Sequence, residues 1–129
     1  MQGRRSFWTW GFERDEPSEA DRRKFASQWS ARLGRRVDPP PIPPVDDIVL
    51  RSARLTIPGA LAPWVSSDKF ERIVHTYGGH PLELLRAMRG DFATPPDAVA
   101  HPRNEAELEA TLAWCDANGH AAIPSGGRT

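Results

Sequence analysis

Proline restricts this chain more than any other residue. Thirteen of the 129 residues are proline, and five of them lie in the seven-residue segment DPPPIPP at positions 38–44. A proline ring fixes φ and removes the backbone N–H donor, so such a run fits neither a helix interior nor a central strand. The sequence predicts a stiff, extended polyproline II segment here. A strap across the protein surface is favoured over a ligand for an SH3-type groove.

Composition excludes several classes of protein. Leu, Ile, Val and Phe together make up 25 of 129 residues, which is little material for a core. The 17 basic residues balance 17 acidic ones, whereas a nucleic-acid-binding protein is expected to carry a basic surplus. No apolar run is long enough for a transmembrane segment, and no signal peptide is recognisable. With a single cysteine, Cys115, we expect a cytoplasmic protein with no nucleic-acid partner.

The sequence divides into three segments. Residues 1–37 form a Trp-rich N-terminal segment with one helix, Ser18–Leu33, which Ser18 caps and Gly34 ends. We expect its aromatic cluster to fold back onto the protein, three apolar residues of the helix to share one face, and its basic residues to form a solvated face. The cluster is Phe7, Trp8, Trp10 and Phe12; the apolar face is Phe25, Trp29 and Leu33; the basic face is Arg22, Arg23, Lys24 and Arg32.

Residues 38–94 combine the Pro-rich strap, an irregular stretch from Asp47 to Ile57, and a helical hairpin. The first helix, Asp68–Tyr77, has a capping box of Asp68 and Glu71. The second helix begins at Pro81 and closes at Gly90, after a Gly-Gly-His-Pro corner. The apolar stripe of the first helix is Phe70, Ile73, Val74 and Tyr77, and the second continues it with Leu82, Leu85 and Met88 or Arg89.

Residues 95–129 have the pattern of a βαβ unit. A strand is predicted near Ala98–Ala100, a helix over Asn104–Asn118 with an Asn104/Glu107 capping box, and a second strand near Ala121–Ile123. Leu108, Leu112 and Cys115 form the predicted buried face of the helix, and Gly119 ends it. The predicted fold class is α+β, with a helical N-terminal region before the βαβ unit and loose packing between the two halves.

No residue carries a recognisable catalytic pattern. His75 and His80 do not share a helical face, and His101 and His120 flank the last predicted helix, so no pair has zinc-ligand spacing. We therefore predict no metal site and interpret the histidines as surface or hydrogen-bonded groups. Cys115 is expected to be an inert apolar residue, and no nucleophile or general acid is assigned.

The Gly-rich end of the sequence is the one candidate binding site. Gly126 and Gly127 allow backbone N–H groups to approach an anion closely, and successive amides in such a turn form a nest for phosphate oxygens. Ser125 and Thr129 add hydroxyl groups and Arg128 adds a positive charge. Alone, so short a motif is typical of a turn. It indicates a phosphate site here because a predicted βαβ unit precedes it.

These residues carry a resemblance to a known family. Residues 96–129, PDAVAHPRNEAELEATLAWCDANGHAAIPSGGRT, resemble the opening of the FAD-binding domain of vanillyl-alcohol oxidase/p-cresol methylhydroxylase (PCMH-type) flavoproteins. That opening is a P-x-x-V-x-x-P strand, a helix with Trp-Cys, and a P-x-G-G-x-T/S pyrophosphate loop. Upstream, FWTWGFERDEP, PPVDDIVLRSARL and HTYGGHPLELLRAMRGDF are similar to bacterial alkyldihydroxyacetonephosphate synthase-like oxidases.

The resemblance implies a site and a cofactor. Its loop positions correspond to Pro124, Ser125, Gly126, Gly127, Arg128 and Thr129, which would line the FAD pyrophosphate. Arg128 stands where the family often has a third glycine. The resemblance further implies an FAD-dependent oxidoreductase acting on a small-molecule or lipid-like substrate, with a homodimer as one option. It implies that these 129 residues are an N-terminal part, truncated inside the loop and inactive alone.

A second hypothesis belongs to another class. The low aliphatic content and the aromatic cluster are also those of a non-enzymatic interaction module, which would hold a partner protein through residues 7–12 and the Pro-rich strap.

Overall fold

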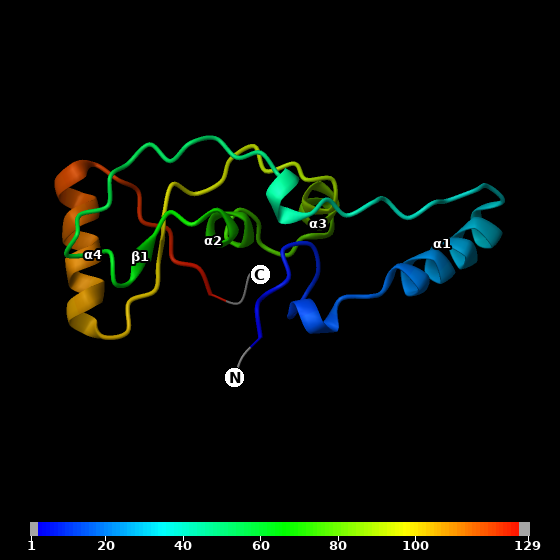
Figure 1. The fold of residues 1–129 in the computed structure, drawn as a ribbon, viewed down its shortest axis with the longest axis horizontal. Helices are drawn as coiled ribbons and strands as arrows, with labels where there is room; N and C mark the ends of the chain where they lie inside the picture. The colour runs from blue at the N-terminus through cyan, green and yellow to red at the C-terminus, as the bar shows by residue number, and fades with distance from the viewer. Residues whose placement is uncertain (1–2, 127–129) are drawn as a thin grey trace.

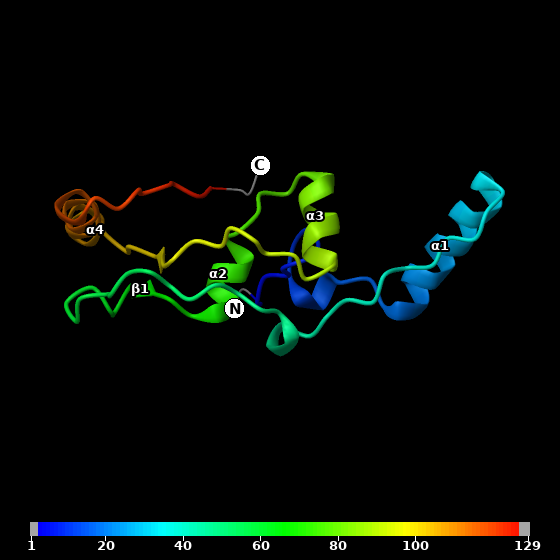
Figure 2. The same cartoon turned by 90° about the horizontal axis from the view of Figure 1, so that it is seen from above.

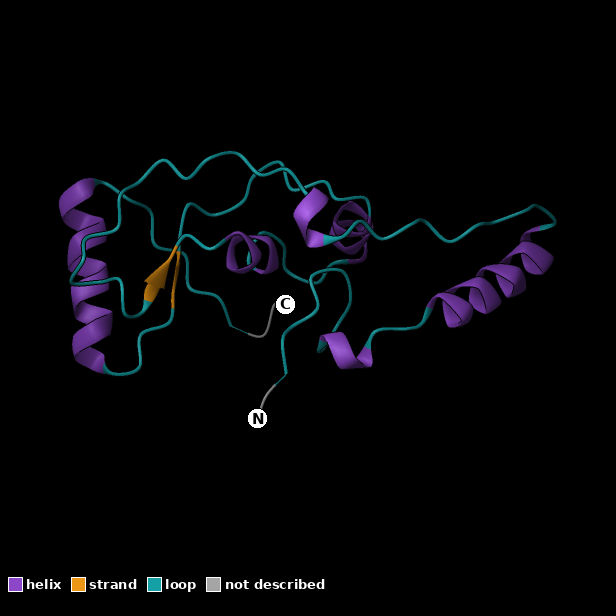
Figure 3. Ribbon diagram, in the orientation of Figure 1, coloured by secondary structure: helices purple, strands orange, loops and turns teal. Residues whose placement is uncertain are grey.

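The computed structural model describes residues 3–126, which form an elongated molecule (Figure 1). Helix α1 (Glu19–Leu33) lies at one end, α4 (Glu105–Asn118) at the other, and α2 (Lys69–Val74) and α3 (Pro81–Met88) lie between them. Two short 3-10 helices, η1 (Glu13–Asp15) and η2 (Val45–Asp47), and two strands, β1 (Val65–Ser66) and β2 (Val99–Ala100), complete the elements (Figure 3). This mixture of helices with a small sheet confirms the general α+β prediction.

The hydrophobic core forms around α2. Ile73 and Val74 face inward, as the predicted stripe requires, with Phe70 and Tyr77 partly buried beside them. The aromatic cluster does fold back: Phe7 and Trp8 are buried in this core, although Trp10 is exposed. Three aromatic rings that are distant in sequence meet there. The Phe92 centroid lies 6.1 Å from that of Phe7 and 5.6 Å from that of Tyr77. The other buried core residues are Ile48 and Ala87.

The two helices of the hairpin form as predicted, but with different boundaries and burial. α2 ends at Val74, three residues early, where His75 turns out of helical geometry. α3 begins at Pro81 as expected, with His80 and Glu83 forming a capping box that the sequence analysis did not identify. Leu82 and Leu85 are exposed, so the prediction that they continue the buried stripe is wrong; the residue that α3 buries is Ala87. The small side chain allows α3 to pack closely against the core.

α1 has the predicted caps but buries a face next to the apolar stripe rather than the stripe itself. Ser18 and Asp21 form a capping box, and Gly34 ends the helix at φ +62°. Phe25, Trp29 and Leu33 are exposed, contrary to an apolar face packed on the protein. The buried face is small and polar: Ala26 is flanked by Arg22, which bonds the Pro40 carbonyl of the strap, and by Ser30, which bonds the backbone of Val37 just before the strap. The prediction of a solvated basic face is thus wrong for Arg22.

Those contacts follow from the strap itself, which runs extended beside α1 as predicted (Figure 2). The carbonyl of Pro40 accepts from the Arg22 guanidinium at 3.0 Å, and the Ser30 hydroxyl accepts from the Val37 N–H at 2.8 Å. A proline-rich segment has few N–H groups of its own, so its carbonyls are satisfied by side chains. At its far end the strap contacts Gly90, where an added Cβ would lie 3.1 Å from Pro43 Cγ.

The sheet differs from the predicted βαβ unit. β2 forms at the predicted place, but its partner is β1, in antiparallel register with Val65 opposite Ala100 and Ser66 opposite Val99. The predicted second strand at Ala121–Ile123 is not formed: residues 120–126 run extended from α4 back toward the middle of the molecule (Figures 1 and 2). Ile123 is 86% exposed. Within residues 3–126 this segment forms no ladder with either strand of the sheet.

α4 is well capped at both ends. Asn104 accepts from the Glu107 N–H at 2.9 Å, while the Glu107 carboxylate binds Arg103 instead of completing the predicted box. Gly119 at φ +64° ends the helix in a Schellman motif, since the His120 N–H bonds the Cys115 carbonyl.

The face that α4 presents to the protein is not the predicted one. Leu108 and Leu112 are exposed and Cys115 is half-buried, so this prediction is wrong. The buried residue is Thr111, whose hydroxyl accepts from the Trp64 indole N–H at 2.9 Å. A buried indole N–H needs an acceptor, and this bond fixes the rotation of the helix.

Across the described part of the chain, every helix is too short or too polar to cross a membrane.

Candidate functional site

The predicted pyrophosphate loop lies at the end of the described chain. Pro124, Ser125 and Gly126 are exposed and have no regular secondary structure. The other three predicted residues, Gly127, Arg128 and Thr129, lie outside the described residues. At Gly126 an added Cβ would meet nothing within 4 Å, so the described half of the loop is open to solvent. The structure thus leaves room for a ligand there without assembling a pocket around it.

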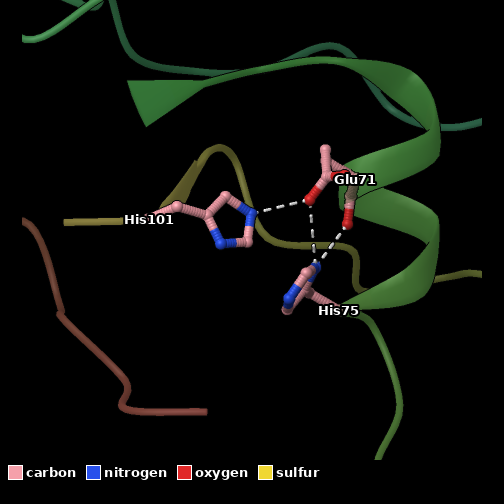
Figure 4. Close-up of side chains that lie close together, drawn as sticks. All are labelled: Glu71, His75 and His101. Atoms are coloured by element: carbon pink, nitrogen blue, oxygen red, sulfur yellow. Dashed lines mark hydrogen bonds and ion pairs between the residues drawn. The ribbon is translucent and has the colours of Figure 1, made fainter. Parts of the chain in front are cut away.

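A second cluster joins side chains that are distant in sequence: Glu71, His75 and His101 (Figure 4). Glu71 and His75 lie four residues apart, in α2 and directly after it, and so face the same side of the helix. His101 directly follows β2, and its N–H bonds the Trp64 carbonyl at 2.8 Å, which extends the β ladder by one bond. The strand pairing therefore places His101 beside α2.

Both histidines contact Glu71: His101 through the carboxylate, and His75 through the carboxylate and the backbone carbonyl. The Glu71 carboxylate Oε2 lies 2.9 Å from His101 Nε2 and 3.7 Å from His75 Nδ1. His75 Nδ1 also lies 2.8 Å from the Glu71 backbone carbonyl. A carbonyl only accepts, so Nδ1 of His75 is the donor in this contact. The two rings pack edge to face with centroids 5.6 Å apart.

A charged junction fixes the chain that leads into β2. Asp97 is mostly buried and accepts hydrogen bonds from the guanidinium groups of Arg51 and Arg54 and from the Arg54 N–H. Arg72, buried on α2, donates to the Pro96 carbonyl at 2.7 Å and to the Arg51 carbonyl at 2.8 Å. Hydrogen bonds from Arg54 and then Arg51 hold the pKa of Asp97 well below its usual range. Residues 51–54, 95–97 and α2 are thus joined next to the histidine cluster.

The cluster was not predicted from the sequence, in which His75 lies nearest to His80, while His101 and His120 flank the last helix. His80 caps α3, and the His120 ring packs on Trp114 at 5.1 Å, which agrees with the hydrogen-bonded or surface roles expected for these two. The i, i+4 spacing of Glu71 and His75 is a signal that the sequence does contain. The position of His101 depends on a β1–β2 pairing that the sequence analysis did not predict.

Comparison of the chain with protein families, with curated proteins and with solved structures finds no match.

Proposed function

We propose that this chain forms the N-terminal part of a PCMH-type FAD-dependent oxidoreductase, similar to the alkyldihydroxyacetonephosphate synthase-like oxidases. In this proposal residues 124–129 bind the FAD pyrophosphate, the flavin supplies the redox chemistry, and a small-molecule or lipid-like compound is the substrate. The resemblance of residues 96–129, together with the three upstream segments, is the basis of the proposal. The fold contributes the order in which β2, the doubly capped α4 and the extended segment 120–126 lead into the loop.

One structural observation supports the proposal further: apolar side chains are unburied on the helix and on the extended segment that lead into the loop. Leu108 and Leu112 of α4 are exposed, and so is Ile123 in the extended segment. An apolar stripe on a helix and an unpaired extended segment are what the first unit of a larger α/β domain presents before its neighbouring strands are added. The remainder of a flavin domain would cover Leu108 and Leu112 and would pair with residues 121–123.

We expect the 129-residue chain alone to be colourless after purification and to retain no FAD. The loop can offer a few charge-assisted hydrogen bonds of about 1.5–3 kcal/mol each. Ordering six loop residues costs about 1–2 kcal/mol per residue, which offsets that gain before translational entropy is counted. The absorbance spectrum of the purified chain and a titration with FAD measure this directly. Stoichiometric flavin, or micromolar affinity, would contradict the proposal that the binding site needs further protein.

The coding DNA and a longer protein test the positive side of the same proposal. Reading frames that continue past the Thr129 codon should encode further Gly-rich flavin-domain sequence; unrelated sequence in all of them would remove the proposal. In the longer protein, Gly126→Val should abolish flavin retention. Gly59→Val is the matched control, because a Cβ at Gly59 also meets nothing within 4 Å but lies far from the loop in sequence. Equal flavin content in both variants would show that the loop does not bind FAD.

A second candidate function, a protein-interaction module, is favoured by the exposed face of α1. Phe7 and Trp8 of the original aromatic cluster are buried in the core, which leaves them no surface for a partner. Phe25, Trp29 and Leu33 instead form an exposed stripe, with the Phe25 and Trp29 centroids 6.0 Å apart. Such a stripe suits an apolar groove in a partner, with an acidic rim to match the basic residues of α1.

Direct binding distinguishes this candidate. A partner captured by the wild-type chain should bind the purified chain directly, and the double variant Phe25→Ser/Trp29→Ser should lose that binding at least tenfold. The matched control Gln28→Ala changes an exposed residue of the same helix outside the stripe. Equal capture by all three proteins would exclude the α1 stripe as the interaction surface.

A further inference from the structure

We propose that Glu71, His75 and His101 bind a divalent transition-metal ion, with Zn²⁺ as the best-matched ion. The residues offer one ligand atom each, and these atoms all lie within 4.8 Å of one another. The proposal is independent of flavin binding, because it uses different residues on a different part of the fold.

The chemistry of the donors selects the class of metal. Two imidazole nitrogens and one carboxylate oxygen are borderline ligands that suit Zn²⁺ and neighbouring transition metals. Mg²⁺ and Ca²⁺ prefer sites made of oxygen atoms. Three protein ligands leave one tetrahedral position for water, and the exposed side of His101 gives the ion access from solvent.

The spacing of the donors is close to what the ion requires. Zn–N and Zn–O bonds of roughly 2.1 Å in a tetrahedron place the donor atoms roughly 3.3 Å apart. Glu71 Oε2 and His101 Nε2 are 2.9 Å apart, so a small separation of these two side chains admits the ion between them. Since no pair of donors exceeds 4.8 Å, shifts of roughly 1 Å per donor complete the tetrahedral site.

Contacts already present hold the ligand side chains in place. Nδ1 is the His75 atom that lies 3.7 Å from the Glu71 carboxylate and 2.8 Å from the Glu71 carbonyl. In the tautomer with the proton on Nε2, Nδ1 exchanges the carbonyl for the ion, so the contact that places the ring beside the carboxylate also places the ligand atom. The backbone of His101 is fixed by its bond to Trp64, and α2 is anchored by buried Ile73 and Arg72. The ion would therefore join two elements whose backbones are already in place, α2 and the end of β2.

Zinc titration of the chelator-treated chain tests the proposal, with calorimetry as the readout. We expect one Zn²⁺ per chain, and at least tenfold weaker binding for His75→Ala, for Glu71→Gln and for His101→Ala. His101→Ala is the key variant because its side chain is largely exposed, so the fold should survive; circular dichroism checks this. His120→Ala is the matched control, since His120 packs on Trp114 away from the cluster. No binding by the wild-type chain, or equal loss in His120→Ala and His101→Ala, would overturn the proposal.

A spectroscopic arm separates a built site from scattered surface binding. Co²⁺ in a tetrahedral site of imidazole and carboxylate ligands absorbs strongly in the visible range, whereas Co²⁺ on scattered ligands in water absorbs weakly. We expect the strong bands with the wild-type chain and with His120→Ala, and their loss in His101→Ala. Zn²⁺ should also raise the thermal midpoint of the wild-type chain but not that of His101→Ala. Weak bands in all proteins, with an unchanged midpoint, would contradict a metal site here.

Discussion

Replacing Ile73 with alanine is expected to lower the free energy of unfolding by about 3 kcal/mol. Ile73 is 1% exposed and lies in the centre of the core around α2. The substitution removes apolar surface from the core and leaves a cavity that the surrounding rings of Phe7 and Phe92 cannot fill without moving. With so few aliphatic residues in the chain, each one in the core carries a larger share of the total stability. Urea unfolding followed by circular dichroism measures the change.

The matched control for this prediction is Leu82→Ala. Leu82 is also an aliphatic residue of the helical hairpin, but it is 62% exposed. Its replacement should change the free energy of unfolding by no more than about 0.5 kcal/mol. Similar effects for the two substitutions would show that α2 does not pack into a core as the structure describes.

Replacing Asp97 with asparagine is expected to destabilise the protein by about 2 kcal/mol at pH 7, because the neutral amide accepts more weakly from the two guanidinium groups and turns an NH2 group toward them in place of one carboxylate oxygen. The effect should depend on pH with a definite sign. The pKa of Asp97 is lower in the folded protein than its ordinary value of 3.8. The stability that the carboxylate provides is therefore complete above about pH 4 and is lost as pH falls toward the folded pKa. The gap between wild type and Asp97→Asn should shrink below pH 4.

Unfolding midpoints at pH 7, pH 4 and lower values measure that gap. Asp38→Asn is the matched control, since Asp38 pairs with Arg36 on the surface with both side chains exposed. Its effect should stay below about 1 kcal/mol at pH 7. A gap for Asp97→Asn that is constant from pH 7 downward would show that the carboxylate does not stabilise the junction in its charged form.

Local signals in the sequence predicted where the helices form. They did not predict which face of α1 or α4 is buried, because packing against distant residues decides that. Ser18, Asp68 and Asn104 cap helices as expected, because a cap depends on a few neighbouring residues. The buried faces of α1 and α4 were predicted wrongly. On α1, Arg22 donates to the Pro40 carbonyl of the strap and Ser30 accepts from the Val37 N–H, so these polar contacts and not the apolar stripe set the buried face. On α4, the Trp64 indole selects Thr111 rather than Leu108 or Leu112.

The two candidate sites also differ in how far the sequence predicts them. The Gly-rich loop is a contiguous motif and is visible in the sequence, although its second half lies outside the described residues. The histidine cluster depends on a contact between residues 71 and 101, which is created by two strands of two residues each. Strands that short have no periodic signal, and the antiparallel pairing of Val65 with Ala100 follows from tertiary structure alone.

The contact between α1 and the core has a consequence for how this protein unfolds locally. Arg22 stacks over the Trp8 ring at 5.6 Å and bonds the Pro40 carbonyl, so one side chain touches the helix, the core and the strap. Ala26 is the buried residue of α1. A helix with so little buried surface unfolds locally at a lower free energy than the core beneath it. We therefore expect α1 to melt and re-form while the Ile73 core stays folded, which hydrogen exchange of the α1 amides would show as protection lower than that of α2.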